Sequence, residues 1–139
     1  MMRRLSLVGW LAAAALAGCC GSSAGPAGTG AEAVVRGYYE AILRKDWEQA
    51  YGLLHAQSKA KSSAAQFARQ AETYRRRLGF EPQQIAVRSC EEHGDEALAH
   101  VVLKGVAGAG PQSYKDAIVV RQGASGWGIV LPPRFGQSP

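Results

Sequence analysis

The stretch VVRGYYEAILRKDWEQAYGLL, residues 34–54, carries the pattern that best predicts the fold. Between Glu32 and Arg44 apolar side chains recur every three or four residues, which predicts an amphipathic helix. They are Val34, Val35, Tyr38, Ile42 and Leu43. Asp46 then has the character of an N-cap, with Gln49 three residues later as in a capping box. A second helix is therefore expected, with Trp47, Ala50, Tyr51 and Leu54 on its buried face.

A third helix is predicted in the same way from Ser63, which is followed by Gln66 at the capping-box spacing. Its apolar face consists of Phe67, Ala71, Tyr74 and Leu78. Gly79 has the place of a C-terminal cap, because glycine adopts the left-handed conformation that ends many helices.

From Gln84 the apolar period changes to two, which indicates strands with one buried face. Four strands are predicted, over residues 84–90, 97–104, 113–121 and 127–131, with a glycine-rich loop over 105–111. Helices followed by an antiparallel meander indicate an α+β fold, with three N-terminal helices packed on a curved four-stranded antiparallel sheet. The predicted domain covers residues 31–133 and is followed by a tail over 134–139.

Two parts of the chain resemble a known family. One is Val35-x-x-Tyr38-Tyr39-x-Ala41-x-x-x-x-Asp46-Trp47-x-x-Ala50-Tyr51-x-Leu53-Leu54, and the other is Trp127-Gly128-Ile129-Val130. They resemble the first helices and the last strand of nuclear-transport-factor-2-like domains, also called ketosteroid-isomerase-like, SnoaL-like or cystatin-like cone folds. The resemblance implies a cone whose enzymes use Asp, His or Tyr side chains inside it. No motif of those enzymes carries over to this chain residue by residue.

The N-terminus has the three parts of a secretory signal: Arg3 and Arg4, an apolar run over residues 5–17, and a short polar-to-small ending. The run is shorter than the roughly 20 residues that a membrane-spanning helix needs. Leu16-Ala17-Gly18-Cys19 resembles the lipobox of bacterial lipoproteins. The resemblance implies cleavage between Gly18 and Cys19 and lipid attachment to the Cys19 thiol. The alternative is an ordinary secretory leader cleaved after Ala15-x-Ala17.

We therefore expect residues 1–18 to be a signal peptide and residues 19–30 to be a lipidated cysteine with a flexible Gly/Ser/Ala tether. The protein would lie in the cell envelope, at the periplasmic face of the outer membrane in a Gram-negative source and otherwise on the outer face of the cell membrane. The charge of +5 falls to +3 when Arg3 and Arg4 are removed, and export argues against a nucleic-acid partner. Cys20 and Cys90 are either a disulfide or, as we favour, unpaired, with Cys90 a small buried hydrophobe.

Candidates for a site are few. Asp116 shares strand parity with Ile118, so it either faces the apolar side, where a buried carboxyl suits a general base, or is solvated or paired with a cation on a neighbouring strand. We favour the second placement. His100 is expected beside solvent rather than in a pocket. The predicted ligand pocket consists of Tyr38, Trp47, Tyr51 and Asp116. No histidines have metal-ligand spacing, so neither a metal nor a cofactor is predicted.

The run Arg75-Arg76-Arg77 at the end of the third helix has two interpretations. Cations there complement the helix dipole, which we favour. Alternatively, they contact an anionic lipid or glycan.

Three functions remain open from the sequence. The leading one is a non-catalytic, lipid-anchored domain that binds a small apolar ligand or an envelope protein. The second is a cofactor-independent isomerase, dehydratase or hydrolase that uses Asp116 with a tyrosine or His100. The third is a structural spacer or a homodimerisation module, since one fold serves many functions.

Overall fold

The computed structural model describes residues 30–137. The predicted signal peptide, the lipidation site at Cys19, Cys20 and most of the tether lie outside the described residues. Among residues 30–137, no helix combines the length and the apolar character that crossing a membrane requires.

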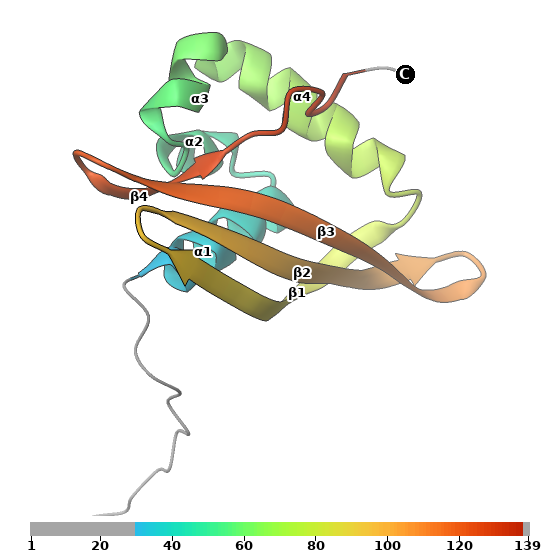
Figure 1. The fold of residues 1–139 in the computed structure, drawn as a ribbon. Helices are drawn as coiled ribbons and strands as arrows, with labels where there is room; N and C mark the ends of the chain where they lie inside the picture. The colour runs from blue at the N-terminus through green and yellow to red at the C-terminus, as the bar shows by residue number, and fades with distance from the viewer. Residues whose placement is uncertain (1–29, 138–139) are drawn as a thin grey trace, which may run out of the picture.

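Four helices come first in this part of the chain (Figure 1): α1 Ala31–Arg44, α2 Trp47–Gly52, α3 Ala56–Lys61 and α4 Ala64–Arg77. The three predicted helices are α1, α2 and α4, and they are confirmed. The short α3 was not predicted. Its N-cap is His55, whose Nδ1 accepts the backbone N–H of Gln57 at 3.2 Å. Histidine is not among the usual N-cap residues, so the sequence carries no recognisable start signal there.

The predicted caps explain where the other helices begin. The Asp46 carboxylate accepts the backbone N–H of Gln49 at 3.1 Å, and the Gln49 side chain accepts from Arg44 instead of closing a capping box. Ser63 and Gln66 do form the complete box, with bonds of 3.2 and 3.0 Å. Each such cap contributes about 1 kcal/mol to helix stability. The break at Asp46 therefore lets two short helices meet at an angle over the sheet.

The sheet is an antiparallel meander in the order β1-β2-β3-β4, with β1 Glu81–His93, β2 Glu96–Ala107, β3 Gly110–Gly123 and β4 Gly126–Val130. The prediction of helices on a four-stranded antiparallel sheet is confirmed. The glycine-rich loop predicted over 105–111 is wrong, because β2 and β3 stay paired as far as Ala107 and Gly110. Gly110 supplies the turn with a φ of 120°, a value that favours glycine.

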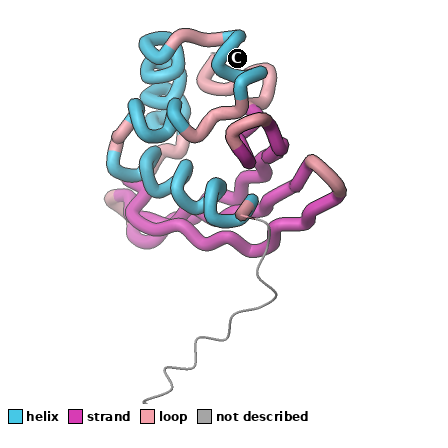
Figure 2. The backbone as a smooth tube through the Cα atoms, turned by 90° about the vertical axis from the view of Figure 1, so that its left-hand side faces the viewer, coloured by secondary structure: helices cyan, strands magenta, loops and turns pink. Residues whose placement is uncertain are grey.

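The helices lie on the concave side of the sheet (Figure 2). Irregularities in the β1–β2 pairing, between Pro82 and Gln84 and between Val87 and Ser89, interrupt the ladder where the long strand bends. Inward residues of the sheet meet inward residues of α1 and α4 in one core. Its largest fully buried side chains are Tyr38, Tyr39, Phe67, Ile42, Leu103, Ile129, Val35, Val101 and Val120.

A short parallel bridge joins the helical half to β4. The backbone N–H of His55 donates to the carbonyl of Ile129 at 2.8 Å, and the N–H of Ile129 donates to the carbonyl of Leu53 at 2.9 Å. A Cβ at Gly128 would lie 2.6 Å from the Cα of His55, so this close approach requires glycine. The bridge holds β4 against the helices and fixes the direction in which the C-terminal segment leaves the sheet.

Candidate functional site

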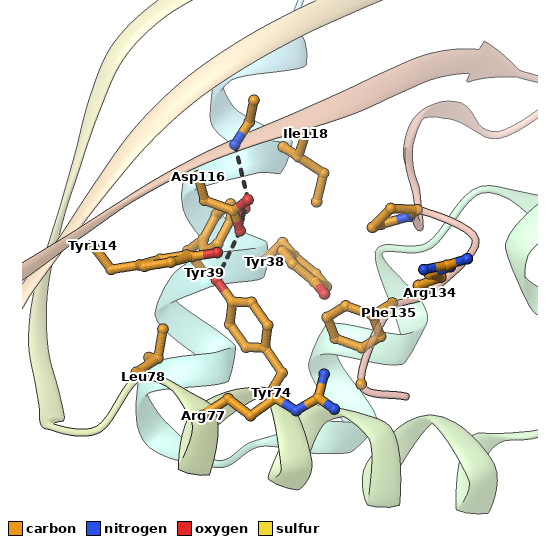
Figure 3. Close-up of a pocket in the computed structure, with 13 residues that line it drawn as sticks. Tyr38, Tyr39, Tyr74, Arg77, Leu78, Tyr114, Asp116, Ile118, Arg134 and Phe135 are labelled. Carbon is orange, nitrogen blue, oxygen red and sulfur yellow. Dashed lines mark hydrogen bonds between the residues drawn. The ribbon is translucent and has the colours of Figure 1, made fainter. Parts of the chain in front are cut away.

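A cavity of about 270 Å³ opens between α1, α4, β3 and the C-terminal segment, residues 132–136 (Figure 3). Its walls are largely aromatic and aliphatic, with a few charged groups. Tyrosines line it from three elements: Tyr38 and Tyr39 on α1, Tyr74 on α4 and Tyr114 on β3. The volume is near the lower end of the range for small-molecule sites, about 300–1,000 Å³.

Strand pairing decides which β3 side chains enter this cavity. Asp116 is paired with Val101 of β2, and directly paired residues share a face of the sheet. Val101 is buried in the core, so Asp116 belongs to the concave face. Asp116 is half-buried there. The placement that we favoured from the sequence, solvated or paired with a cation, is therefore wrong.

The partners of Asp116 are tyrosines. Its Oδ2 accepts the hydroxyl of Tyr39 at 2.8 Å and the hydroxyl of Tyr74 at 2.7 Å, and its Oδ1 accepts the backbone N–H of Ala117 at 2.9 Å (Figure 3). Both carboxylate oxygens are thus occupied by donors. These are charge-assisted bonds, which are stronger than bonds between neutral groups.

The same arrangement keeps the tyrosines protonated. Burial, followed by the charge of Asp116, raises the pKa of Tyr38 and Tyr74 well above 10.0. Burial is also the first cause of the raised pKa of Tyr39, followed by Tyr74 and Asp116. The three hydroxyls are therefore neutral donors up to strongly alkaline pH.

The Tyr38 hydroxyl differs from those of Tyr39 and Tyr74 in its hydrogen bonding. Tyr38 is 1% exposed, and its hydroxyl has no hydrogen-bond partner within residues 30–137. It points toward the Phe135 side of the cavity (Figure 3). A buried hydroxyl without a partner costs about 1–3 kcal/mol, so each such group calls for an explanation. A ligand atom in the cavity would supply the missing bond.

The C-terminal segment forms one wall. Phe135 is 9% exposed, and its ring stacks on Phe67 with centroids 5.8 Å apart and lies 5.3 Å from Tyr74. Gly136 has a φ of 61°, and a Cβ there would lie 2.2 Å from the carbonyl oxygen of Gln70 on α4. The prediction of a tail over residues 134–139 is wrong at Phe135, which belongs to the core.

Two arginines lie at the cavity's edge. Arg77 ends α4 and Arg134 belongs to the C-terminal segment, and both line the cavity with exposed side chains. In the described chain, neither guanidinium group has a hydrogen-bond or ion-pair partner. Arg75 is different: it is 5% exposed and donates to the carbonyls of Ile42 and Leu43 at 3.0 and 2.9 Å and to Glu81. One arginine run thus has two separate roles.

The remaining predicted site residues lie elsewhere. His100 is paired with Ala117, and it is exposed on the outer face of the sheet. Tyr51 does not line the cavity. Its hydroxyl donates to the carbonyl of Ser62 at 3.0 Å. Trp47 is half-buried against the core and likewise does not line it. Of the four predicted pocket residues, Tyr38 and Asp116 line the cavity.

The cavity-lining residues Tyr39, Tyr74, Arg77, Arg134 and Phe135 were not singled out from the sequence as pocket residues. From the sequence, Tyr39 and Tyr74 form an aromatic set with Tyr38, Trp47 and Tyr51 that is assigned mainly to the core, with the rim of a pocket as the alternative for some members. Arg134 and Phe135 follow two prolines, a signal that correctly ended β4 but said nothing of the chain's return to α4. Their assignment needed the tertiary structure.

Cys90 is half-buried against the core, and burial, followed by the carboxylates of Glu92 and Glu32, raises the pKa of its thiol. The favoured interpretation, that Cys90 and Cys20 are unpaired, stays a prediction, since Cys20 lies outside the described residues. Within residues 30–137, no three His, Cys, Asp or Glu side chains are grouped so as to hold a metal ion.

Neither a protein-family model nor a curated protein matches the sequence. Solved structures match the fold. RPA3114 of Rhodopseudomonas palustris, a SEC-C motif containing protein, has a TM-score of 0.55 at 16% identity, over 72% of this chain and 74% of its own. A protein of Campylobacter jejuni named as an NTF2-like transpeptidase has a TM-score of 0.53 at 13% identity, over 73% and 97%.

A SEC-C motif containing protein of Psychrobacter arcticus has a TM-score of 0.58 at 13% identity, and the match spans 78% of this chain and 62% of that one. Likeness at such identities shows the fold and nothing more. The fold is the NTF2-like α+β cone that the sequence resemblance implied.

Proposed function

We propose that this protein is a lipid-anchored lipoprotein of the cell envelope whose cone-shaped domain binds a small, mainly apolar ligand without catalysis. The observation that carries the ligand proposal is the buried Tyr38 hydroxyl, which lines an apolar cavity and has no partner among the described residues. The anchor rests on the sequence alone: Arg3 and Arg4, the apolar run over residues 5–17, and Leu16-Ala17-Gly18-Cys19. Two or more acyl chains on Cys19 would hold the domain firmly to a membrane.

The hydrogen bonds of Asp116 argue for binding rather than for catalysis. A general base needs a lone pair directed at a substrate proton. Oδ2 of Asp116 already accepts two phenolic hydroxyls, and Oδ1 accepts a backbone N–H. The second candidate of the sequence, His100, is on the other face of the sheet. Asp116 and the tyrosines do meet at the cavity, but the hydroxyls of Tyr39 and Tyr74 are directed at Oδ2 of Asp116 rather than at a substrate.

The cavity itself argues against a simple spacer. A module that served only as a spacer or a dimer unit would gain stability from a filled cone, because unfilled volume forfeits packing contacts. Here Gly136 holds the C-terminal segment against α4 while the space between Tyr38, Ile118 and Phe135 stays open. An open cavity with an unsatisfied polar group is the usual form of a ligand site.

The anchor is tested by mass spectrometry and membrane fractionation of the protein expressed in a bacterium with a lipoprotein pathway. The mature chain is expected to begin at Cys19, to carry a diacylglyceryl mass and to sediment with membranes. Cys19→Ser should release it, whereas the neighbouring Cys20→Ser should not. An unmodified chain that starts after Ala17 would refute the anchor.

Ligand binding is tested with octan-1-ol, which has an apolar chain and one hydroxyl, by calorimetry on the full chain carrying Cys19→Ser. We expect saturable binding of one molecule. Leu78→Trp, which fills the cavity, should weaken binding at least ten-fold. Leu98→Trp, the same change on the outer face where Leu98 is 39% exposed, should leave it unchanged. If no octyl compound binds, the proposed ligand site does not exist.

A further inference from the structure

The charges around the cavity are divided between two sides. The Asp116 carboxylate lies on the Tyr114 side, while the guanidinium groups of Arg77 and Arg134 lie around Phe135 (Figure 3). The carboxylate is held by the hydroxyls of Tyr39 and Tyr74. The guanidinium groups have no protein partner within residues 30–137. A ligand that enters the cavity therefore meets two guanidinium groups without a protein partner on one side and one hydrogen-bonded carboxylate on the other.

The two arginines come from different elements that the fold brings together. Arg77 is the last residue of α4, and Arg134 directly precedes Phe135, whose ring packs on Phe67 and Tyr74 of the same helix. Gly136, which has no side chain, lets the segment approach the backbone of Gln70 closely. Both backbones are thus anchored by the core. The planar guanidinium fork suits carboxylate and phosphate oxygens particularly well.

The C-terminus of α1 does not need these two cations. The carbonyls that end α1 are satisfied by Arg75, which is buried and also pairs with Glu81. Arg134 is outside any helix. The favoured interpretation of the arginine run, cations that complement the dipole of their own helix, applies to Arg77 in the last turn of α4. That interaction leaves the guanidinium donors of Arg77, like those of Arg134, without a hydrogen-bond partner among residues 30–137.

We propose that the ligand is a single-chain amphiphile with an anionic head, a carboxylate or a phosphate, which Arg77 and Arg134 bind at the cavity's edge. Its chain lies against Tyr38, Ile118 and Phe135. This assignment rests on the proposed ligand site and adds its chemical class. The Tyr38 hydroxyl donates to a polar atom of the ligand near the head, because its direction is toward the Phe135 side.

The test compares octanoate, octyl phosphate, octan-1-ol and octyltrimethylammonium, which share one chain and differ in the head. Calorimetry on the full chain carrying Cys19→Ser gives the affinities. We expect at least one of the two anions to bind about ten-fold more tightly than octan-1-ol, and the ammonium compound to bind more weakly than the alcohol. The two anions separate a fatty-acid-like source from a phosphate-ester source.

The arginines are tested with matched double variants. Arg77→Gln with Arg134→Gln should remove the ten-fold preference for the anion over the alcohol, with about a three-fold loss per arginine, as for an exposed ion pair of about 0.7 kcal/mol. Arg69→Gln with Arg76→Gln removes the same charge from exposed positions of α4 that do not line the cavity, and the preference should persist. For the protein without arginine substitutions, raising the salt concentration should reduce the preference for the anion over the alcohol.

The outcomes separate the two proposals. If octan-1-ol binds as tightly as both anions, or if the Arg77/Arg134 variant keeps the preference, the anionic class is wrong while the ligand site stands. If none of the four compounds binds, both proposals fail.

Discussion

Helix α1 takes part in two polar clusters that differ in one respect. At its C-terminus is the Arg75 cluster, formed by Arg75, Glu81 and the carbonyls of Ile42 and Leu43. Along its middle is the Asp116 cluster, formed by Asp116 with Tyr38, Tyr39 and Tyr74. In the first, the guanidinium bonds to three acceptors. The second contains a buried hydroxyl without a partner.

Whether every buried polar group has a hydrogen-bond partner distinguishes a cluster that stabilises the fold from a cluster that can bind another molecule. Buried polar groups stabilise a protein when they are satisfied and cost free energy when they are not. The Asp116 cluster also lines a cavity. Satisfaction, rather than polarity or burial alone, distinguishes a structural cluster from a candidate site here.

The largest effect is expected at Arg75. Arg75→Ala leaves the Leu43 carbonyl and Glu81 without this partner and removes one of the two donors to the Ile42 carbonyl, the other being the backbone N–H of Lys45. It should therefore lower the free energy of unfolding by about 3 kcal/mol. The neighbouring Arg76→Ala, at an exposed position, should change it by less than about 0.5 kcal/mol. Urea unfolding followed by circular dichroism measures both. Equal effects of the two variants would mean that the Arg75 cluster is not structural.

The sequence predicted the fold well because its signals are local. Asp46 and Ser63 cap helices by bonds to residues three positions away, and the change of period at Gln84 depends on neighbours in the chain. These local signals do not depend on the tertiary contacts. His55 is an exception: it caps α3 with an imidazole, which is not a usual capping group. The sequence therefore carries no local signal for α3.

The site was predicted only in part because its partners are distant in sequence. Strand parity allowed Asp116 to face inward, but the outcome depended on Tyr39 and Tyr74, which lie 77 and 42 residues away. Strand parity predicts the face of the sheet on which a side chain lies, but not which side chains of other elements contact it there. Phe135 was missed for the same reason, since only the packed α4 shows that the chain returns to it.

A second prediction uses pH to probe the Asp116 cluster. The folded-state pKa of Tyr39 is raised well above its ordinary 10.0. Its contribution to stability is therefore fully present below about pH 10 and is lost as the pH rises toward the folded-state value. Above pH 10 each such tyrosine should lower the free energy of unfolding by about 1.4 kcal/mol per pH unit.

Tyr39→Phe isolates this contribution. The decline of stability between about pH 10.5 and pH 11.5 should be shallower in the variant by about 1.4 kcal/mol per pH unit, because one masked phenol is gone. Urea titrations at successive pH values give the two slopes. Parallel slopes would mean that Tyr39 ionises in the folded protein and that the cluster does not hold its proton.

The smallest effect on stability is expected at Tyr38, and it has the opposite sign to that at a satisfied tyrosine. Tyr38→Phe removes a hydroxyl that has no partner among the described residues, so stability should stay the same or rise by up to about 1 kcal/mol. Tyr51→Phe is the matched control, because it removes a hydroxyl that donates to Ser62 and should cost about 1 kcal/mol.

The affinity for octan-1-ol, unlike the stability, should change in Tyr38→Phe and not in Tyr51→Phe. Tyr38→Phe should weaken octan-1-ol binding about five-fold, the equivalent of one hydrogen bond of about 1 kcal/mol, while Tyr51→Phe should leave binding unchanged. Thermal unfolding and calorimetry on the same preparations give both quantities. A Tyr38→Phe variant that loses stability as Tyr51→Phe does, with affinity intact, would show that the hydroxyl serves the fold. A gain or no change in stability combined with weaker binding ties the open hydroxyl to the ligand, because no contact within the fold then accounts for its burial.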